Sequence, residues 1–139
     1  EQFLGYDNTT DAVLIGAGKL GLALMAYSGF DAYGLNIQAA FDINPTMEKT
    51  EDGQPIYHIS RLAHYCKLHK VLMGIITVPA GAAQEVADQL IAGGVKAIWN
   101  FAPTHLDVPP NILVQNENMA TSLAVLSVHL RAAMKEEKK

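Results

Sequence analysis

A glycine-rich turn between two apolar segments constrains the fold of this chain more than any other feature. Residues 11–15 read DAVLI, an apolar run typical of a buried strand, and the sequence GAGKLG follows at once. After the glycines, apolar residues recur with helical spacing at Leu20, Ala23, Leu24 and Tyr27. A strand, a glycine-rich turn and a helix in that order are typical of the start of a dinucleotide-binding α/β domain.

Each glycine of this motif has its own expected task. Gly16 makes the tight turn, Gly18 lets a pyrophosphate approach the backbone, and Gly21 lets the helix pack closely on the strand. The phosphates then meet free N–H groups at the positive end of the helix. A turn that serves packing alone is the alternative, since the glycine spacing by itself is a weak signal.

The rest of the chain alternates strands with helices. We expect further strands over Asn36–Phe41, Pro55–Ile59, Val71–Val78, Ala97–Pro103 and Asn111–Val114, and helices over residues 61–68, capped by Ser60, and 81–92. The run Val71–Val78 is almost wholly apolar, which is typical of a strand buried on both faces. The alternation predicts the α/β class, with a Rossmann-like, doubly wound parallel sheet.

The C-terminal part reads as one long helix from about Asn116 to Met134. Apolar residues follow heptad spacing there, at Met119, Leu123, Leu126 and Leu130. We therefore divide the chain into a Rossmann domain, residues 1–115, and a C-terminal helix and tail, residues 116–139. Two interpretations stay open: the helix packs on its own sheet, or it is exchanged with a second subunit.

Composition bears on the class of partner and on the compartment. The 139 residues carry a net charge of −4 and no basic stripe, so they offer no electrostatic surface for nucleic acid. No apolar run reaches the roughly eighteen residues of a membrane span, and we expect no signal peptide. The single cysteine, Cys66, cannot form an internal disulfide, which favours the cytoplasm. It is expected to be a packed hydrophobic residue rather than a catalytic thiol.

An acid closes the second predicted strand. Asp42 follows Gly21 by about twenty residues, the spacing of the acid that binds the adenosine ribose in dinucleotide sites. A carboxylate accepts hydrogen bonds from a ribose diol but repels a 2′-phosphate, and neither Ile43 nor Asn44 supplies a positive charge. The sequence therefore favours NAD(H) over NADP(H), with a solvated turn acid as the alternative.

Two later strand ends qualify as parts of the same site. They are TVPA, Thr77–Ala80, and NFAP, Asn100–Pro103, whose polar side chains either bind a cofactor or satisfy the local backbone. The only nearby titratable groups are His105 and Asp107, and the histidines around Cys66 fit no usual zinc pattern. We predict neither a catalytic residue nor a metal site, and hence a domain that binds a cofactor without turning it over.

Several longer motifs resemble the sensor domain of the Rex family of redox-sensing transcriptional repressors, over residues 3–130. The most specific are TVPAGAAQ, GVKAIWNFAP and LDVP. The resemblance implies a bacterial homodimer that reads the balance of NADH and NAD⁺, with a C-terminal helix exchanged between subunits. In that family an N-terminal winged helix binds operator DNA; no such segment stands in this sequence, and its removal or its loss in evolution are both open.

The resemblance also assigns residues. It places the pyrophosphate at the glycine turn, the adenosine ribose at Asp42, and the nicotinamide half at the two later strand ends. Tyr27 matches a tyrosine that couples redox state to DNA binding in some members, but Asn118 replaces the usual aspartate and Met119 an aromatic residue. Asn118 cannot carry the aspartate's charge. The full expected cofactor-binding set is Gly16, Ala17, Gly18, Lys19, Leu20, Gly21, Asp42, Ile43, Thr77, Val78, Pro79, Asn100, Phe101 and Ala102.

The expected mechanism is a difference in affinity between two redox forms. The reduced nicotinamide is neutral and the oxidised ring is cationic, so NADH suits an apolar pocket better and biases the angle between subunits. One other interpretation is the CoA-binding domain of an acyl-CoA ligase, although the 3′-phosphate of CoA fits Asp42 less well and a ligase needs a catalytic histidine downstream. Another is a small NAD-dependent reductase that lacks its substrate domain.

Overall fold

Strands alternate with helices along the part of the chain that the computed structural model describes, which is residues 9–27, 30, 34–117, 128 and 130–135. The first half contributes β1 (Thr10–Ile15), α1 (Lys19–Ala26), β2 (Leu35–Asp42), β3 (Ile56–His58) and the 3₁₀ helix η3 (Ile59–Arg61). The second half contributes α2 (Leu62–His69), β4 (Met73–Ile76), α3 (Ala80–Ala92), β5 (Ala97–Asn100) and β6 (Leu113–Asn116).

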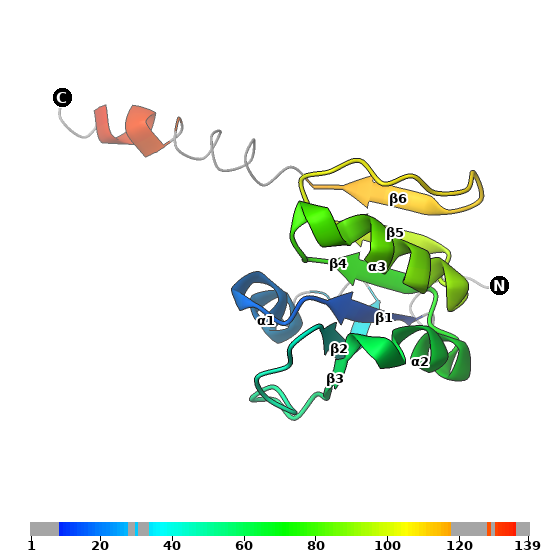
Figure 1. The fold of residues 1–139 in the computed structure, drawn as a ribbon. Coiled ribbons are helices and arrows are strands. Elements are labelled where there is room, and N and C mark those ends of the chain that lie inside the picture. Colours follow the sequence, from blue (N-terminus) through cyan, green and yellow to red (C-terminus); the bar gives the residue numbers. More distant parts are fainter. Residues whose placement is uncertain (1–8, 28–29, 31–33, 118–127, 129, 136–139) are drawn as a thin grey trace.

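The strands form one six-stranded sheet in the order β3-β2-β1-β4-β5-β6, and every neighbouring pair is parallel. Figure 1 shows α2 and α3 lying across one face, and α1 starting from the edge where the strands end. This confirms the predicted Rossmann-like, doubly wound sheet. It also brings segments far apart in the sequence to one edge of the sheet.

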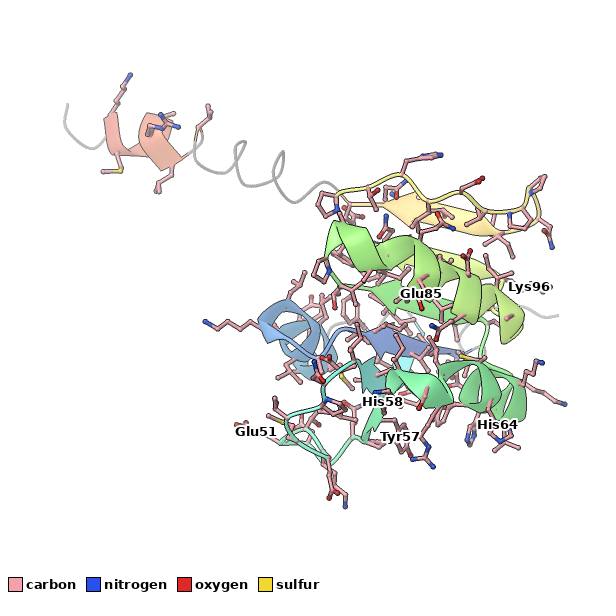
Figure 2. The ribbon with its side chains drawn as sticks, viewed as in Figure 1. Glu51, Tyr57, His58, His64, Glu85 and Lys96 are labelled. Carbon is pink, nitrogen blue, oxygen red and sulfur yellow. The ribbon has the colours of Figure 1, made fainter. Side chains whose placement is uncertain are left out.

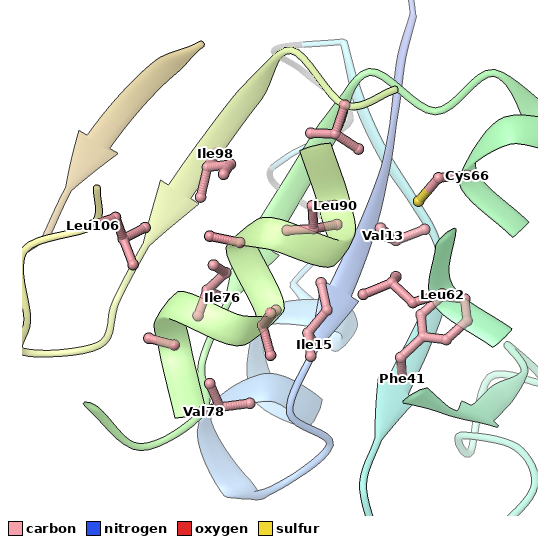
Figure 3. Packing of buried hydrophobic residues seen from close by; sticks show 14 of the residues in the cluster. Val13, Ile15, Phe41, Leu62, Cys66, Ile76, Val78, Leu90, Ile98 and Leu106 are labelled. Carbon is pink, nitrogen blue, oxygen red and sulfur yellow. The ribbon is translucent and has the colours of Figure 1, made fainter. Parts of the chain in front are cut away.

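Two hydrophobic cores lie on opposite faces of the sheet, and β1 supplies both. Val13 and Ile15 pack with α2 and α3, whereas Ala12 and Leu14 pack with α1. All four side chains are fully buried. Figure 3 shows the first of these cores, where Leu90 of α3 reaches the strands. Residues Ala12–Ile15 of β1 and Gly74–Ile76 of β4 are buried, so these parts of the central strands are apolar on both faces, as predicted for the strand over residues 71–78.

Helix α3 approaches the sheet closely at one glycine. A Cβ atom on Gly74 of β4 would lie 2.5 Å from Cδ1 of Leu90, so a side chain there would push the helix away. The absence of that side chain lets α3 lie against β4. The helix N-terminus, capped by Pro79, is thereby held beside the loop that leaves β4.

Several predicted boundaries differ from the observed ones for identifiable reasons. The predicted strands Val71–Val78 and Ala97–Pro103 shorten to β4 and β5, since side-chain hydrogen bonds of Thr77 and Asn100 join the loops there. The predicted Ser60 cap is wrong: α2 begins after Arg61, and Ser60 lies inside η3. There the ring of His58 accepts a hydrogen bond from the backbone N–H of Ser60.

The C-terminal segment is described only in part. Asn116, predicted to begin the long helix, instead ends β6, while residues 130–135 are helical. The heptad positions Met119, Leu123 and Leu126, together with Asn118, lie outside the described residues. Within the described ranges, no helix is both long and apolar enough to cross a bilayer.

Candidate functional site

The order of the strands reverses direction between β1 and β4. The chain moves from β1 to β2 and β3 on one side, and β4, β5 and β6 extend the sheet on the other. In open α/β sheets the loops that leave such a point diverge, and ligands bind in the crevice between them. The turn after β1, the end of β2 and the loop after β4 all meet at this edge (Figure 1).

The three glycines of the turn differ in what requires them. Gly16 has a φ of 109°, a backbone conformation that other residues rarely adopt, and a Cβ there would lie 2.6 Å from Oγ1 of Thr77. A Cβ on Gly21 would lie 1.9 Å from the carbonyl oxygen of Gly16. A Cβ on Gly18 would meet no atom within 4 Å. The protein itself therefore requires Gly16 and Gly21, whereas the space beside Gly18 is open.

The N-terminus of helix α1 lies at this edge of the sheet (Figure 1). Its N-cap is Gly18, which has no side chain to occupy the first N–H groups, and its first turn contains no acidic residue. Those N–H groups have no acceptor within the helix and carry the positive end of its dipole. The exposed side chain of Lys19 adds a positive charge at the same end. This arrangement suits the anionic phosphates of a nucleotide.

The carboxylate of Asp42 is held against the glycine turn. Its Oδ2 accepts a hydrogen bond of 2.8 Å from the backbone N–H of Ala17, and its Oδ1 accepts one of 3.1 Å from the backbone N–H of Asn44. The side chain is half-buried, and the neighbouring Ile43 is half-exposed. Each carboxylate oxygen keeps further acceptor capacity, which two ribose hydroxyls can use.

The hydroxyl of Thr77 is engaged by the backbone of the β1 turn. Its Oγ1 lies 2.8 Å from the carbonyl oxygen of Gly16 and 3.0 Å from that of Ile15, so it donates to one or both. The backbone N–H of Thr77 also donates to Ile15. The Thr77 hydroxyl thus satisfies backbone carbonyls, which is one of the two roles expected for this side chain.

Asn100 has a similar local role at the end of β5. It is fully buried, and its Nδ2 donates to the carbonyl oxygens of Ala102 and Thr104 and to Oδ1 of Asn116. Its Oδ1 accepts from the backbone N–H of Ala102 at 3.0 Å. The side chain thereby shapes the loop that carries Phe101, and a ligand would meet that loop rather than the amide.

Apolar side chains border the expected nicotinamide half. Val78 and Ala102 are buried and Phe101 is half-buried, whereas Pro79 is exposed at the N-terminus of α3. Phe101 begins a row of aromatic rings that continues away from the crevice. The ring centroids of Phe101 and Trp99 lie 4.7 Å apart. Those of Trp99 and Phe30 lie 5.7 Å apart, and those of Phe30 and Tyr27 lie 4.9 Å apart.

The cysteine and the histidines of β3 and α2 lie away from the glycine turn. Cys66 is fully buried in the core, and burial raises the pKa of its thiol to about 11, as suits a packed residue. His58 and His64 sit on β3 and α2 without converging on one point (Figure 2). Among the described residues, no three histidine, cysteine or acidic side chains gather as metal ligands would.

Sequence reasoning missed the side chains that support the site. Asn116 accepts from Asn100, which sits opposite it in the β5–β6 register. Gln84 of α3 bonds both the N–H and the carbonyl of Asp107 and so fixes the loop after β5. Gln84 ends the motif TVPAGAAQ and Asp107 lies in LDVP, but neither motif by itself indicates that the two residues bond each other. Asn118 and Met119, expected to take part in coupling, lie outside the described residues.

A family model and a named relative both match most of this chain. The family model for the CoA binding domain matches residues 7–104. The redox-sensing transcriptional repressor Rex of Porphyromonas gingivalis strain W83 is 48% identical over 125 residues, which are 89% of this chain and 57% of that protein.

Solved structures of a relative superpose on nearly the whole chain. RSP, described as a Rex-family repressor, is 33% identical, and its complex with NADH matches with a TM-score of 0.82 over 95% of this chain and 64% of that one. Its complex with NAD⁺ and operator DNA matches with a TM-score of 0.81 over 96% and 62%. The chain thus spans about three-fifths of the length of these relatives.

Proposed function

The chain belongs to the CoA binding domain family and is a homologue of the Rex redox-sensing repressors, and from this we propose that it is an NAD(H)-binding redox-sensor domain. The RSP structures with NADH and with NAD⁺ support this choice of cofactor. The matched relatives are named as transcriptional repressors, so the proposed role is to sense the cofactor and not to turn it over.

One observation supports NAD(H) over CoA more than any other. The acid that ends β2 is held 2.8 Å from the glycine turn, with oxygens left to accept from a ribose diol. CoA carries a phosphate on its ribose, and a phosphate beside Asp42 would place like charges in contact. At an intermediate effective dielectric that repulsion is about 4 kcal/mol per charge pair. The family takes its name from CoA, but this carboxylate favours a free diol.

The expected difference in affinity between NADH and NAD⁺ follows from the apolar residues that border the nicotinamide half. The half-buried Phe101 and the exposed Pro79 offer apolar surface there, and the carboxylate of Glu117 near Phe101 already accepts a hydrogen bond from Nε1 of Trp99. A cationic oxidised ring would lose hydration against this surface, and an acid that is engaged with Trp99 would compensate only in part. The neutral reduced ring would not lose hydration in this way, and we expect NADH to bind more tightly than NAD⁺.

Isothermal titration calorimetry with four ligands tests the proposal. We expect NADH to bind, NAD⁺ to bind about tenfold or more weakly, and NADPH and CoA to bind about a hundredfold more weakly than NADH. Asp42→Asn is the matched variant, because it keeps the shape of the side chain and removes its charge. It should reduce the difference in affinity between NADH and NADPH. Tighter binding of CoA than of NADH would favour the ligase interpretation, and turnover of a substrate would favour the reductase.

The remaining family properties concern a full-length repressor of the Rex type. In a Rex-type repressor of full length, a DNA-binding segment outside this sequence would contact the operator, in the cytoplasm, and the sensor would set the spacing of two such segments. We propose that the C-terminal helix makes the homodimer by exchange. In the described part of this helix, Val128, Leu130 and Met134 are each about half-exposed or more. Exposed apolar side chains on a helix are typical of a surface that binds a partner.

A further inference from the structure

One peptide group of the glycine turn is held at both ends by side chains from different strands. The hydroxyl oxygen of Thr77 lies 2.8 Å from the carbonyl oxygen of the Gly16–Ala17 peptide, closer than the 3.0 Å that separates it from the carbonyl oxygen of Ile15. The N–H of the same peptide donates to the carboxylate of Asp42 at 2.8 Å. Asp42 ends β2 and Thr77 follows β4, so the two side chains reach this peptide from either side of β1.

The surrounding contacts leave this peptide little freedom to rotate. The N–H of Gly16 donates to the carbonyl of Phe41 at 2.8 Å, which ties the turn to β2. The carbonyl oxygen of Gly16 also lies where a Cβ on Gly21 would be, so helix α1 packs directly against it. Rotation of the peptide would therefore break both side-chain hydrogen bonds.

We propose that Thr77 is a positioning residue of the dinucleotide site, whose hydroxyl holds the Gly16–Ala17 peptide and, through it, the carboxylate of Asp42. The proposal rests on the proposed function, because it assigns Asp42 the ribose. Because the single hydroxyl proton is engaged by the turn, the expected contact of Thr77 with the nicotinamide half would use the lone pairs or the methyl group of the side chain. Thr77 thus influences the adenosine half of the ligand from the strand at the other side of β1.

Thr77→Val tests this arrangement, because valine has the shape of threonine and no proton to donate. The first measurement is amide hydrogen exchange by NMR in the protein without ligand. We expect faster exchange at the amide of Ala17, with the core amide of Leu14 unchanged as evidence that the fold is intact. Unchanged exchange at Ala17 would overturn the proposal. If the valine variant does not fold, Thr77→Ala takes its place.

The second measurement compares ADP, which lacks the nicotinamide half, with NADH. We expect Thr77→Val to weaken both ligands by the same factor, about fivefold to tenfold. Thr77→Ser restores a hydroxyl and should recover most of that loss. Loss of NADH affinity with ADP unaffected would overturn the proposal in favour of a direct nicotinamide contact. Failure of the wild-type protein to bind either ligand would instead refute the proposed function, and the exchange at Ala17 would still decide whether the peptide is held.

Discussion

At the residue scale, the glycine turn separates what the fold requires from what a ligand requires. Gly16 has a positive φ that other residues rarely adopt, and Gly21 needs to be without a side chain because the carbonyl oxygen of Gly16 occupies that space. Gly18 meets neither condition: its φ is −82° and the space around it is open. The residue that folding does not require is the one that stands at the N-terminus of α1.

Gly18→Ala is therefore expected to separate stability from binding. The change should alter the free energy of unfolding by no more than about 1 kcal/mol, measured by urea denaturation. Its Cβ should occupy the path of the pyrophosphate and weaken NADH by about tenfold or more. Gly21→Ala is the contrasting variant and should destabilise the fold by about 3 kcal/mol or more through steric conflict. If Gly18→Ala binds NADH with wild-type affinity, the phosphates do not bind at this turn.

At the element scale, helix α2 ends on a strained residue. Lys70 has a φ of 53° and a ψ of 47°, the left-handed conformation that favours glycine. Its N–H bonds the carbonyls of Cys66 and Lys67, and the next N–H, of Val71, also bonds Cys66. These hydrogen bonds close the last turn of the helix and keep the lysine in this conformation.

Lys70→Gly should stabilise the protein by about 0.5–1 kcal/mol, because glycine adopts the same backbone angles with little strain. Lys67→Gly is the matched control: it removes the same side chain from an exposed position within α2 and should cost about 1 kcal/mol. Chemical denaturation measures the change in the free energy of unfolding for both variants. Equal destabilisation in the two variants would mean that the angles at residue 70 carry no strain.

The elements themselves were largely predictable from the sequence, and their ends were not. Apolar runs and helical spacing predicted β1, β4 and α3, since these patterns reflect burial on known faces. The strands that were predicted too long end where Thr77 and Asn100 bond the backbone through their side chains. Such bonds depend on the three-dimensional arrangement of distant segments. The link from Ala17 to Asp42 is another example, because spacing predicted the acid but not its partner.

At the scale of the whole molecule, the face of the sheet that packs with α1 carries an apolar hollow. It measures about 660 Å³ and is lined by β4, β5 and β6 residues that include Met73, Trp99 and Leu113. Leu113 is 72% exposed. Residues 130–135 form a helix that lies away from the sheet in Figure 1 and exposes apolar side chains of its own. Two exposed apolar surfaces on one chain are consistent with the proposed homodimer.

Leu130→Glu should weaken that dimer, because it places a charge among the exposed apolar residues of the C-terminal helix. We expect the wild-type chain to sediment as a dimer in analytical ultracentrifugation and Leu130→Glu to dissociate at about tenfold or more higher protein concentration. Ala132→Glu adds the same charge on another side of the helix and should have a smaller effect. A monomeric wild-type chain, or equal effects of the two variants, would contradict exchange through this helix.

The central claim is that the glycine turn and Asp42 together hold a dinucleotide by its diphosphate and its unphosphorylated ribose. A crystal structure of this chain with NADH tests it most directly. The account predicts the diphosphate at the N-terminus of α1 and a ribose hydroxyl within hydrogen-bonding distance of the Asp42 carboxylate. An empty crevice at saturating NADH, or an adenosine bound away from Asp42, would contradict it.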